Sequence, residues 1–316
     1  MKTLLAGLVL ALASAAAAAQ AFPSRPVTLL ITFPAGGPTD IAGRALAEAT
    51  SKYLGQPVIV ENRPGAGGTL GAAALVNARP DGYLVSMIPS TVFRTPHMED
   101  VAFDPTKHIR YVMGVSGYVF AVVVRADAPW KTFADLASHV KANPEKVSYG
   151  SHGVGSTVHL SMEELALTQG WKLTHVPYKG SADMMSALLG GHINVALDST
   201  GAAPFVAGGK ARVLAVYTET RAALWPEVPT LKELGYPFAV TSPYGIGVPA
   251  GTDPKVVKAL HDAFKKGLED PAHLKVLERY NQPALYLSSE DYEKFAREQF
   301  ERERRILAQL GLAKKK

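Results

Sequence analysis

The chain has 316 residues, a formal net charge of +5 and no cysteine. The absence of cysteine excludes disulfides, thiolate metal ligands and cysteine nucleophiles. The positive excess is small and partly held by the final three lysines, so nucleic acid, which needs a concentrated basic face, is not expected as a partner.

The first 21 residues have the layout of a secretory signal peptide. Met1 and Lys2 give a short positive start, a run of small apolar residues follows, and an A-x-A cleavage pattern ends at Ala21. A membrane anchor is the alternative, but no stop-transfer charge cluster follows the run. We therefore expect an exported protein whose mature chain begins near Phe22.

Short apolar runs then alternate with helical periodicity. Val27 to Phe33 is a continuous apolar run, typical of a strand buried on both faces, and helical spacing follows from Ile41 to Leu54. The same alternation continues through "PVIVEN", "TLGAAALVNA" and "YLVSMI". This order predicts an α/β fold with mostly parallel sheets flanked by helices.

The middle of the chain repeats the theme, and its end is helical. Strand patterns in "YVFAVVV", "KVSYG", "LTHVPY", "INVALD" and "RVLAVY" alternate with helical ones. Helices are predicted over three C-terminal segments: Pro254–Glu269, His273–Tyr280 and Ser289–Leu310.

Two extended passages, around Val124 and Tyr244, are candidate connectors. If both join the same pair of lobes, residues 22–123 and 243–316 form lobe 1 and residues 124–242 form an inserted lobe 2. A ligand would then lie between the lobes. Two ordinary surface loops are the alternative.

The turn "PAGGPTD", after the first strand, has the chemistry of an anion site. Gly36 and Gly37 allow the backbone to approach a ligand, and Thr39 or Asp40 can cap the following helix. The free N–H groups of a first helical turn favour an anion. A capped helix without a ligand is the alternative.

A second turn, "GSHGVGST" from Gly150 to Thr157, matches the phosphate-loop pattern except that Ser156 replaces the lysine. Without that lysine the β- and γ-phosphates of a nucleotide are not neutralised. A glycine loop with neutral hydroxyl donors suits a carboxylate better. We therefore expect an anion other than a nucleotide, and no cofactor.

Catalytic and metal-binding arrangements are not supported. No G-x-S-x-G elbow occurs, and the adjacent Ser151 and His152 would not point at one another to form a triad with Asp198. His159 and Glu163 are one helical turn apart, which is more often a surface contact than a metal site. Neither a catalytic residue nor a metal ligand is assigned.

Several motifs in order resemble one family. They are "FPSRPVTLLITFPAGGPTDIAGR", "GQPVIVENRPGAGGTLGA", "PDGY", "ANPEKVSYGSHGVGSTVHL", "VPYKG", "LLGGHINVALD" and "VPTLKELGY". Together they resemble the substrate-binding (TctC) proteins of tripartite tricarboxylate transporters, also called Bug proteins, over nearly the whole mature chain. The resemblance implies a two-lobed, type II periplasmic binding protein. It would capture a mono-, di- or aromatic carboxylate and deliver it to a membrane permease of one large and one small subunit.

The resemblance also implies a set of ligand-binding residues in both lobes. In the first turn these are Ala35, Gly36, Gly37, Thr39 and Asp40. In the second turn they are Ser151, Gly153, Gly155, Ser156 and Thr157, with His159 beside the pocket. In the inserted lobe, Tyr178 either donates its hydroxyl or packs as an aromatic, and Asp198 anchors donors, because two carboxylates repel.

The stretch 89–103 follows the family pattern least closely. Ser90 and Thr91, at a strand end, are candidates for the distal end of the ligand. Arg94 is either a partner for a second carboxylate or a solvated loop cation.

The expected mechanism is capture by closure of one lobe about the connectors. A periplasmic sensor that presents the same solute to a signalling receptor is the alternative, and an enzyme on this fold is a third possibility. The cleft is the same in each case, so the sequence does not separate them.

Overall fold

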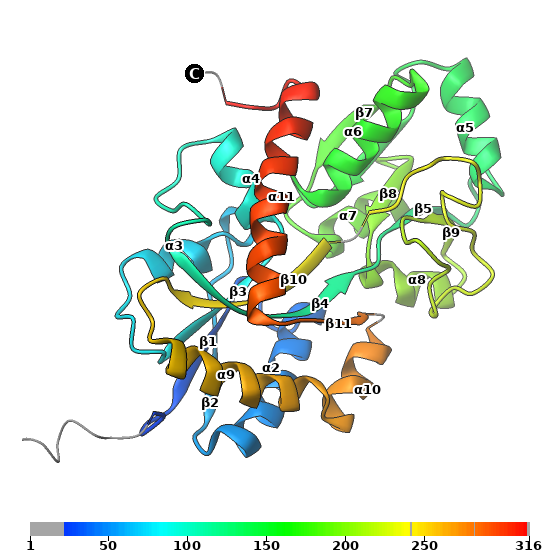
Figure 1. Cartoon of the computed structure of the whole chain (residues 1–316). Coiled ribbons are helices and arrows are strands. Elements are labelled where there is room, and N and C mark those ends of the chain that lie inside the picture. The colour runs from blue at the N-terminus through cyan, green and yellow to red at the C-terminus, as the bar shows by residue number, and fades with distance from the viewer. Residues whose placement is uncertain (1–21, 241, 281, 315–316) are drawn as a thin grey trace, which may run out of the picture.

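The computed structural model describes residues 22–240, 242–280 and 282–314. Within them the chain forms two β-sheets, each flanked by helices (Figure 1), which confirms the predicted two-lobed α/β fold. We call each sheet with its helices a lobe. The predicted signal peptide, residues 1–21, lies outside the described residues.

The first lobe is built on a six-stranded sheet in the order β11-β4-β10-β3-β1-β2. Its strands are β1 (Val27–Ile31), β2 (Val58–Asn62), β3 (Leu84–Ile88), β4 (Ile109–Tyr118), β10 (Ser242–Pro249) and β11 (Ala284–Leu287). One face packs on α2 (Pro38–Leu54), α9 (Pro254–Leu268) and α10 (Pro271–Arg279). The other packs on α3 (Leu70–Val76), α4 (Thr91–Met98) and α11 (Ser289–Gln309), and a short 3-10 turn, η1 (Ala66–Gly68), precedes α3.

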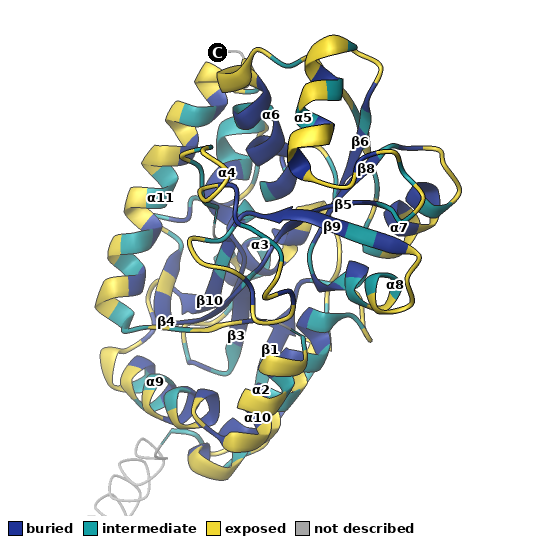
Figure 2. Cartoon of the chain, turned by 90° about the vertical axis from the view of Figure 1, so that its right-hand side faces the viewer, coloured by how far each residue is buried: buried dark blue, intermediate teal, exposed yellow. Residues whose placement is uncertain are grey.

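The second lobe is built on a five-stranded sheet in the order β7-β6-β8-β5-β9. Its strands are β5 (Ala121–Arg125), β6 (Ser148–Ser151), β7 (Thr174–Pro177), β8 (Val195–Asp198) and β9 (Ala211–Val216). Helices α5 (Phe133–Ala142) and α6 (Thr157–Gln169) cover one face, and α7 (Ser181–Leu189), η2 (Thr200–Ala202) and α8 (Ala203–Ala207) cover the other. In both lobes most strand residues are buried, while the outer faces of the helices are exposed (Figure 2).

The sheets are mixed, which corrects the prediction that they are mostly parallel. β1 pairs in parallel with β2 and β3, and β6 with β7 and β8, as helical crossovers require. The strands that link the lobes pair antiparallel. β4 leaves the first sheet at Tyr118, and β10 enters beside it at Ser242, so the two must run in opposite directions.

The chain passes from the first sheet to the second between β4 and β5, at residues 119–120. This is slightly before the boundary that the sequence analysis placed after Val123. The return is at β10, close to the predicted boundary at residue 243. The proposal that these passages act as hinges between moving lobes stays a prediction.

Both sheets contain the same reversal of winding. β1 lies between β2 and β3, and β6 lies between β7 and β8. In each case the chain first adds a strand on one side of the starting strand and then crosses to the other side. Such switch points open a crevice at the carboxyl ends of the strands, where ligands of α/β sheets bind. The two glycine turns follow β1 and β6, so both lie at a switch point.

Strong helical periodicity gave accurate boundaries at the C-terminal end. The three predicted helices match α9, α10 and α11 within two residues at each end. The helix α4 was not predicted, because Pro96 lies inside it.

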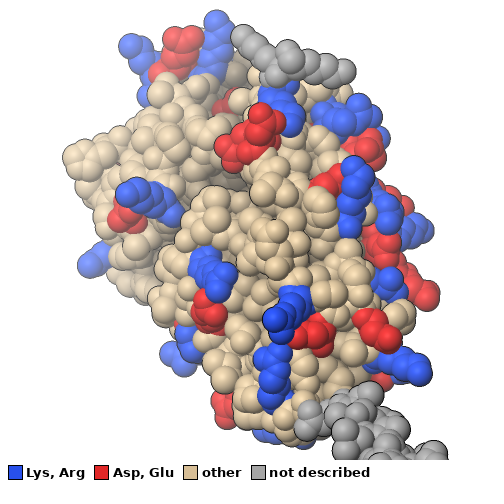
Figure 3. All heavy atoms as spheres, turned by 90° about the vertical axis from the view of Figure 1, so that its left-hand side faces the viewer, with Lys and Arg blue, Asp and Glu red and all other residues tan. Residues whose placement is uncertain are grey.

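On the face drawn in Figure 3, acidic and basic side chains are interspersed, and no single-sign stripe is seen.

The close approach of β10 to its neighbours gives a test of the fold. A Cβ on Gly245 would overlap the carbonyl oxygen of Met113 and the ring of Tyr292. We expect Gly245→Ala to lower the free energy of unfolding by about 1–3 kcal/mol, because neither neighbour can move freely. Urea denaturation measures this. The control is Gly180→Ala, where a Cβ meets open space and the change should stay within about 0.5 kcal/mol. Equal stability of the two variants would contradict the packing.

Candidate functional site

The first turn is closed by the buried carboxylate of Asp40. One oxygen, Oδ2, accepts the Gly36 N–H at 2.9 Å and Arg44 Nε at 3.0 Å, and the other accepts Asn62 Nδ2 at 2.8 Å. Burial opposes ionisation of Asp40, but these hydrogen bonds and the charge of Arg44 outweigh it and lower its pKa. The Asp40 carboxylate therefore stabilises the turn and takes up the hydrogen bond of the Gly36 amide.

The capping expected of Thr39 or Asp40 is wrong in detail. The helix α2 begins at Pro38, and Gly37 is its N-cap, without a side-chain cap. Pro38 carries no N–H, so the first-turn donors without an intrahelical acceptor are the amides of Thr39 and Asp40. The Thr39 hydroxyl is hydrogen-bonded to Tyr118 OH at 2.8 Å, where the chain leaves the first sheet. Ala35 is exposed on the turn.

In the second turn, too, part of the backbone is hydrogen-bonded to nearby side chains. Gly153 and Gly155 have φ of +112° and +74°, which favour glycine. The Gly153 N–H donates to Ser151 Oγ at 3.2 Å, and the Gly155 N–H donates to His159 Nδ1 at 3.1 Å. Ser156 caps α6 by accepting the amide of His159. The donors left for a ligand are thus the first-turn amides of α6 and nearby hydroxyls, not the glycine amides themselves.

A row of hydroxyls joins the two lobes. Thr157 Oγ1 at the start of α6 lies 3.1 Å from Ser242 Oγ, which donates to Ser90 Oγ at 3.4 Å. Ser90 Oγ donates in turn to the Pro243 carbonyl at 2.9 Å. Ser90 and Thr157 are therefore brought together, as their assignment to one site requires. The Thr91 hydroxyl is outside this row and donates to the carbonyl of Gly67 at 2.7 Å.

Arg94 has neither of the two roles expected for it. It lies on α4, its side chain is only 4% exposed, and it donates Nε and Nη2 to both carboxylate oxygens of Glu303 at 2.8 and 2.7 Å. Its third nitrogen, Nη1, donates to the Gly155 carbonyl at 2.7 Å. Burial opposes ionisation of Glu303, but the charge and hydrogen bonds of Arg94 keep its pKa below the ordinary value. Nη1 also donates to Thr157 Oγ1 at 3.4 Å. Arg94 therefore fixes the second turn from the first lobe, and each of its three nitrogens already donates within the protein.

Two stacked imidazoles are hydrogen-bonded to the second turn. The rings of His159 and His175 are 4.0 Å apart, and His175 Nε2 is hydrogen-bonded to Ser151 Oγ at 2.7 Å. Burial lowers the pKa of both to about 4, helped by the charge of Arg94 at His159 and by His159 itself at His175. Both rings are thus neutral near pH 7, which lets His159 accept the Gly155 amide.

At the end of β8, Asp198 is fully buried. Its Oδ1 is 2.8 Å from His152 Nε2, and its Oδ2 accepts Ser181 Oγ at 2.5 Å. This fits the anchoring role expected for it. Tyr178 is partly buried against the apolar core of the second lobe. Sequence reasoning missed Ser242, Tyr118 and Ser181, because each meets its partner only through the fold.

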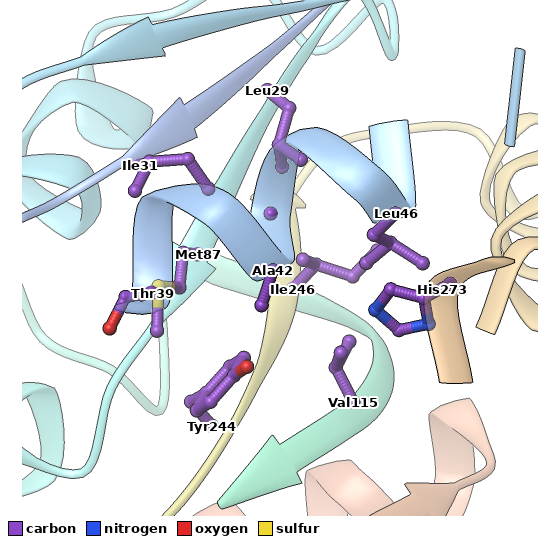
Figure 4. A pocket seen from close by; sticks show the side chains of 11 residues that line it. Leu29, Ile31, Thr39, Ala42, Leu46, Met87, Val115, Tyr244, Ile246 and His273 are labelled. Carbon is purple, nitrogen blue, oxygen red and sulfur yellow. The ribbon is translucent and has the colours of Figure 1, made fainter. Parts of the chain in front are cut away.

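Two cavities in the lobes are too small to be the ligand site. One lies under α2, lined by Leu29, Ala42, Leu46 and Met87 among others, with the His273 ring at its edge (Figure 4). Its volume is about 10 Å³, room for about one water molecule. The other lies in the core of the second lobe. Of the candidate residues, only Thr39 lines either cavity.

Comparison with known proteins decides the family. Residues 42–312 match the tripartite tricarboxylate transporter family receptor, TctC. The chain belongs to this family. It is thus a solute-binding receptor rather than an enzyme, as the resemblance implied.

Individual receptors are similar over almost the full chain. A UPF0065 protein in the gbd 5' region of Cupriavidus necator is 47% identical over 98% of this chain and 94% of its own length. The structure of the periplasmic binding protein BugD is 31% identical, with a TM-score of 0.83 over 93% of this chain and all of that one. Rpa4515 of R. palustris, solved with adipate, is 28% identical, with a TM-score of 0.84 over 92% of this chain and 99% of that one.

Over 22–240, 242–280 and 282–314, no three histidine or acidic side chains gather closely enough to hold a metal ion. Over the same ranges, no helix has the length and apolar character needed to span a bilayer.

The buried pair of Arg94 and Glu303 yields a stability prediction. We expect Arg94→Met to lower the free energy of unfolding by about 3–5 kcal/mol, because Glu303 is left buried without its cation. The double variant Arg94→Met/Glu303→Leu should cost less, since it removes both charges. Urea denaturation at pH 7.5 measures each. The control is the exposed pair Arg297–Glu293, which lies on α11 as Glu303 does. Arg297→Met should lower the free energy of unfolding by at most about 1 kcal/mol. Similar losses for both arginine variants would contradict the buried pair.

The stacked histidines yield a pH prediction. Their folded pKa of about 4 lies below the ordinary 6.5, so the unfolded chain binds protons that the folded one does not. Stability should therefore fall from about pH 6.5 to about pH 4, by up to about 1.4 kcal/mol per pH unit for each histidine. Urea denaturation from pH 7.5 to 4.5 measures the slope. His175→Gln should reduce this slope by up to about 1.4 kcal/mol per pH unit, the contribution of one proton. An unchanged slope would contradict the assignment.

Proposed function

We propose that this receptor captures a small organic carboxylate between its two lobes in the periplasm and delivers it to a tripartite membrane permease. The observation that carries the proposal is that two glycine turns open helices at the two switch points. Each turn leaves first-turn amides toward an anion and is closed by its own buried acid. Relatives are described as periplasmic, and one was solved with adipate, a dicarboxylate.

The donors that the two helix N-termini supply are neutral amides and hydroxyls. Arg94 donates to Glu303, Gly155 and the Thr157 hydroxyl, and Arg44 donates to Asp40 and Asn62. Amides and hydroxyls at helix N-termini attract a carboxylate without a full opposing charge. Such a site binds reversibly, which suits a receptor that must release its cargo to a permease.

The row of hydroxyls connects the two lobes beside the proposed ligand site. Ser90 and Ser242 belong to the first lobe and Thr157 to the second, so a ligand held by Thr157 also engages the edge of the first lobe. Rotation about the passages at 119–120 and just before β10 would bring both turns onto one carboxylate and expel water.

The proposal is tested with the mature chain from Phe22. Acetate, benzoate, succinate, adipate and citrate are titrated by thermal shift and calorimetry, and native mass spectrometry identifies any acid retained on purification. We expect at least one acid to raise the Tm. Failure of every acid to bind, with no acid retained, would overturn the proposal.

A matched pair of variants tests the site itself. Thr157→Val removes the hydroxyl at the start of α6 and should weaken the acid that binds best by about 10-fold, as one hydrogen bond to a charged group is worth. Thr168→Val removes a single hydrogen bond at the far end of the same helix and should leave affinity unchanged. If both variants bind as the unaltered receptor does, Thr157 is not a ligand contact.

A further inference from the structure

The strongest unused feature of the second lobe is the pair His152–Asp198. His152 follows β6 and Asp198 ends β8, and these two strands are neighbours in the sheet. The switch point of the second sheet lies between them. A ligand in the crevice at this point would meet the side chain that follows β6.

Hydrogen bonds hold the pair in place. Asp198 is fully buried, and both of its oxygens are occupied, by His152 Nε2 and Ser181 Oγ. The backbone of η2 packs against it so closely that a Cβ on Gly201 would overlap Ser181 and approach Asp198 Oδ2 at 2.9 Å. The imidazole of His152 is therefore held by Nε2, and its other nitrogen, Nδ1, lies on the far side of the ring.

The outer side of that ring reaches solvent. The His152 side chain is 27% exposed, whereas Asp198 is 0% exposed. A carboxylate buried without a partner is costly, and His152, whose ring can carry a positive charge, is the group paired with Asp198. Arg94, which also touches this turn, already donates from all three of its nitrogens. His152 thus keeps a ring nitrogen, Nδ1, that makes no hydrogen bond within the described residues.

We propose that His152, oriented by Asp198 and Ser181, is a ligand-binding residue that donates its Nδ1–H to the bound carboxylate. This rests on the proposed function and deepens it. A carboxylate only accepts hydrogen bonds, so the contact requires a proton on Nδ1 while Nε2 keeps its own toward Asp198. The charges then alternate along the row: the Asp198 carboxylate is negative, the His152 imidazolium is positive and the ligand carboxylate is negative. The site therefore selects an acid whose carboxylate is at this end and rejects a neutral amide of the same shape.

Calorimetry on variants tests the contact, with the best-binding acid of benzoate, succinate, adipate and citrate as the probe. We expect His152→Ala to weaken binding by about 10- to 100-fold, the range of a hydrogen bond between charged groups. Asp198→Asn should weaken it less, because the ring remains but is no longer held by a charge. His192→Ala is the matched control, because His192 is exposed and lies before the amino end of β8, opposite the end that carries Asp198. The affinity of this variant should not change.

A spectroscopic measurement on the unaltered receptor does not depend on whether a variant folds. In the ¹⁵N-labelled complex, both His152 ring nitrogens should show the chemical shifts of a doubly protonated imidazolium. An acid that binds while Nδ1 stays unprotonated, or while His152→Ala keeps full affinity, would overturn this inference and leave the proposed function standing. Binding of none of the acids would overturn both.

Discussion

The candidate site depends on buried carboxylates that are fully hydrogen-bonded. Asp40 closes the first turn, Asp198 holds the ring on the second, and Glu303 orients the arginine that grips the second turn from behind. Each is buried, and a buried charge is tolerated only when paired and hydrogen-bonded. The three acids thereby determine which N–H groups are used inside the protein and which are left for a ligand. They also place negative charge close to a proposed anion site, which is possible because each acid is already hydrogen-bonded to its own partners within the protein.

The local parts of this arrangement could be predicted from the sequence. Glycines at positive φ, a helix that starts directly after a strand, and the periodicity of α9 and α11 are encoded within a few residues. These signals located both turns and the C-terminal helices. They failed at α4, where a proline lies inside a short helix. They also failed on strand direction, because whether β10 runs with or against β4 depends on where the chain re-enters the sheet and not on its residues.

The partners of the turns could not be predicted, for a physical reason. Arg94 and Glu303 are 209 residues apart, and Ser90 and Ser242 are 152 apart. Nothing in the residues near Arg94 separates a buried, fully paired guanidinium from a solvated one or from a ligand contact. The same limit applies to Gly153 and Gly155. Their positive φ was readable, but whether their amides face a ligand or the protein depends on Ser151 and His159, whose directions follow from the fold.

The contact between Arg94 and Gly155 couples the ligand turn to the end of the chain. Glu303 lies on α11, Arg94 on α4, and Gly155 between β6 and α6, so one guanidinium joins three elements from both lobes. A Cβ on Gly155 would lie 2.7 Å from the Sδ and Cε atoms of Met98 of α4, so the two elements are in close contact here. Because His159 holds the amide of Gly155 while Arg94 holds its carbonyl, the orientation of this residue is fixed from both lobes at once. A movement of α11 relative to the second lobe would therefore reach the turn directly, through a short charged link with no flexible segment between.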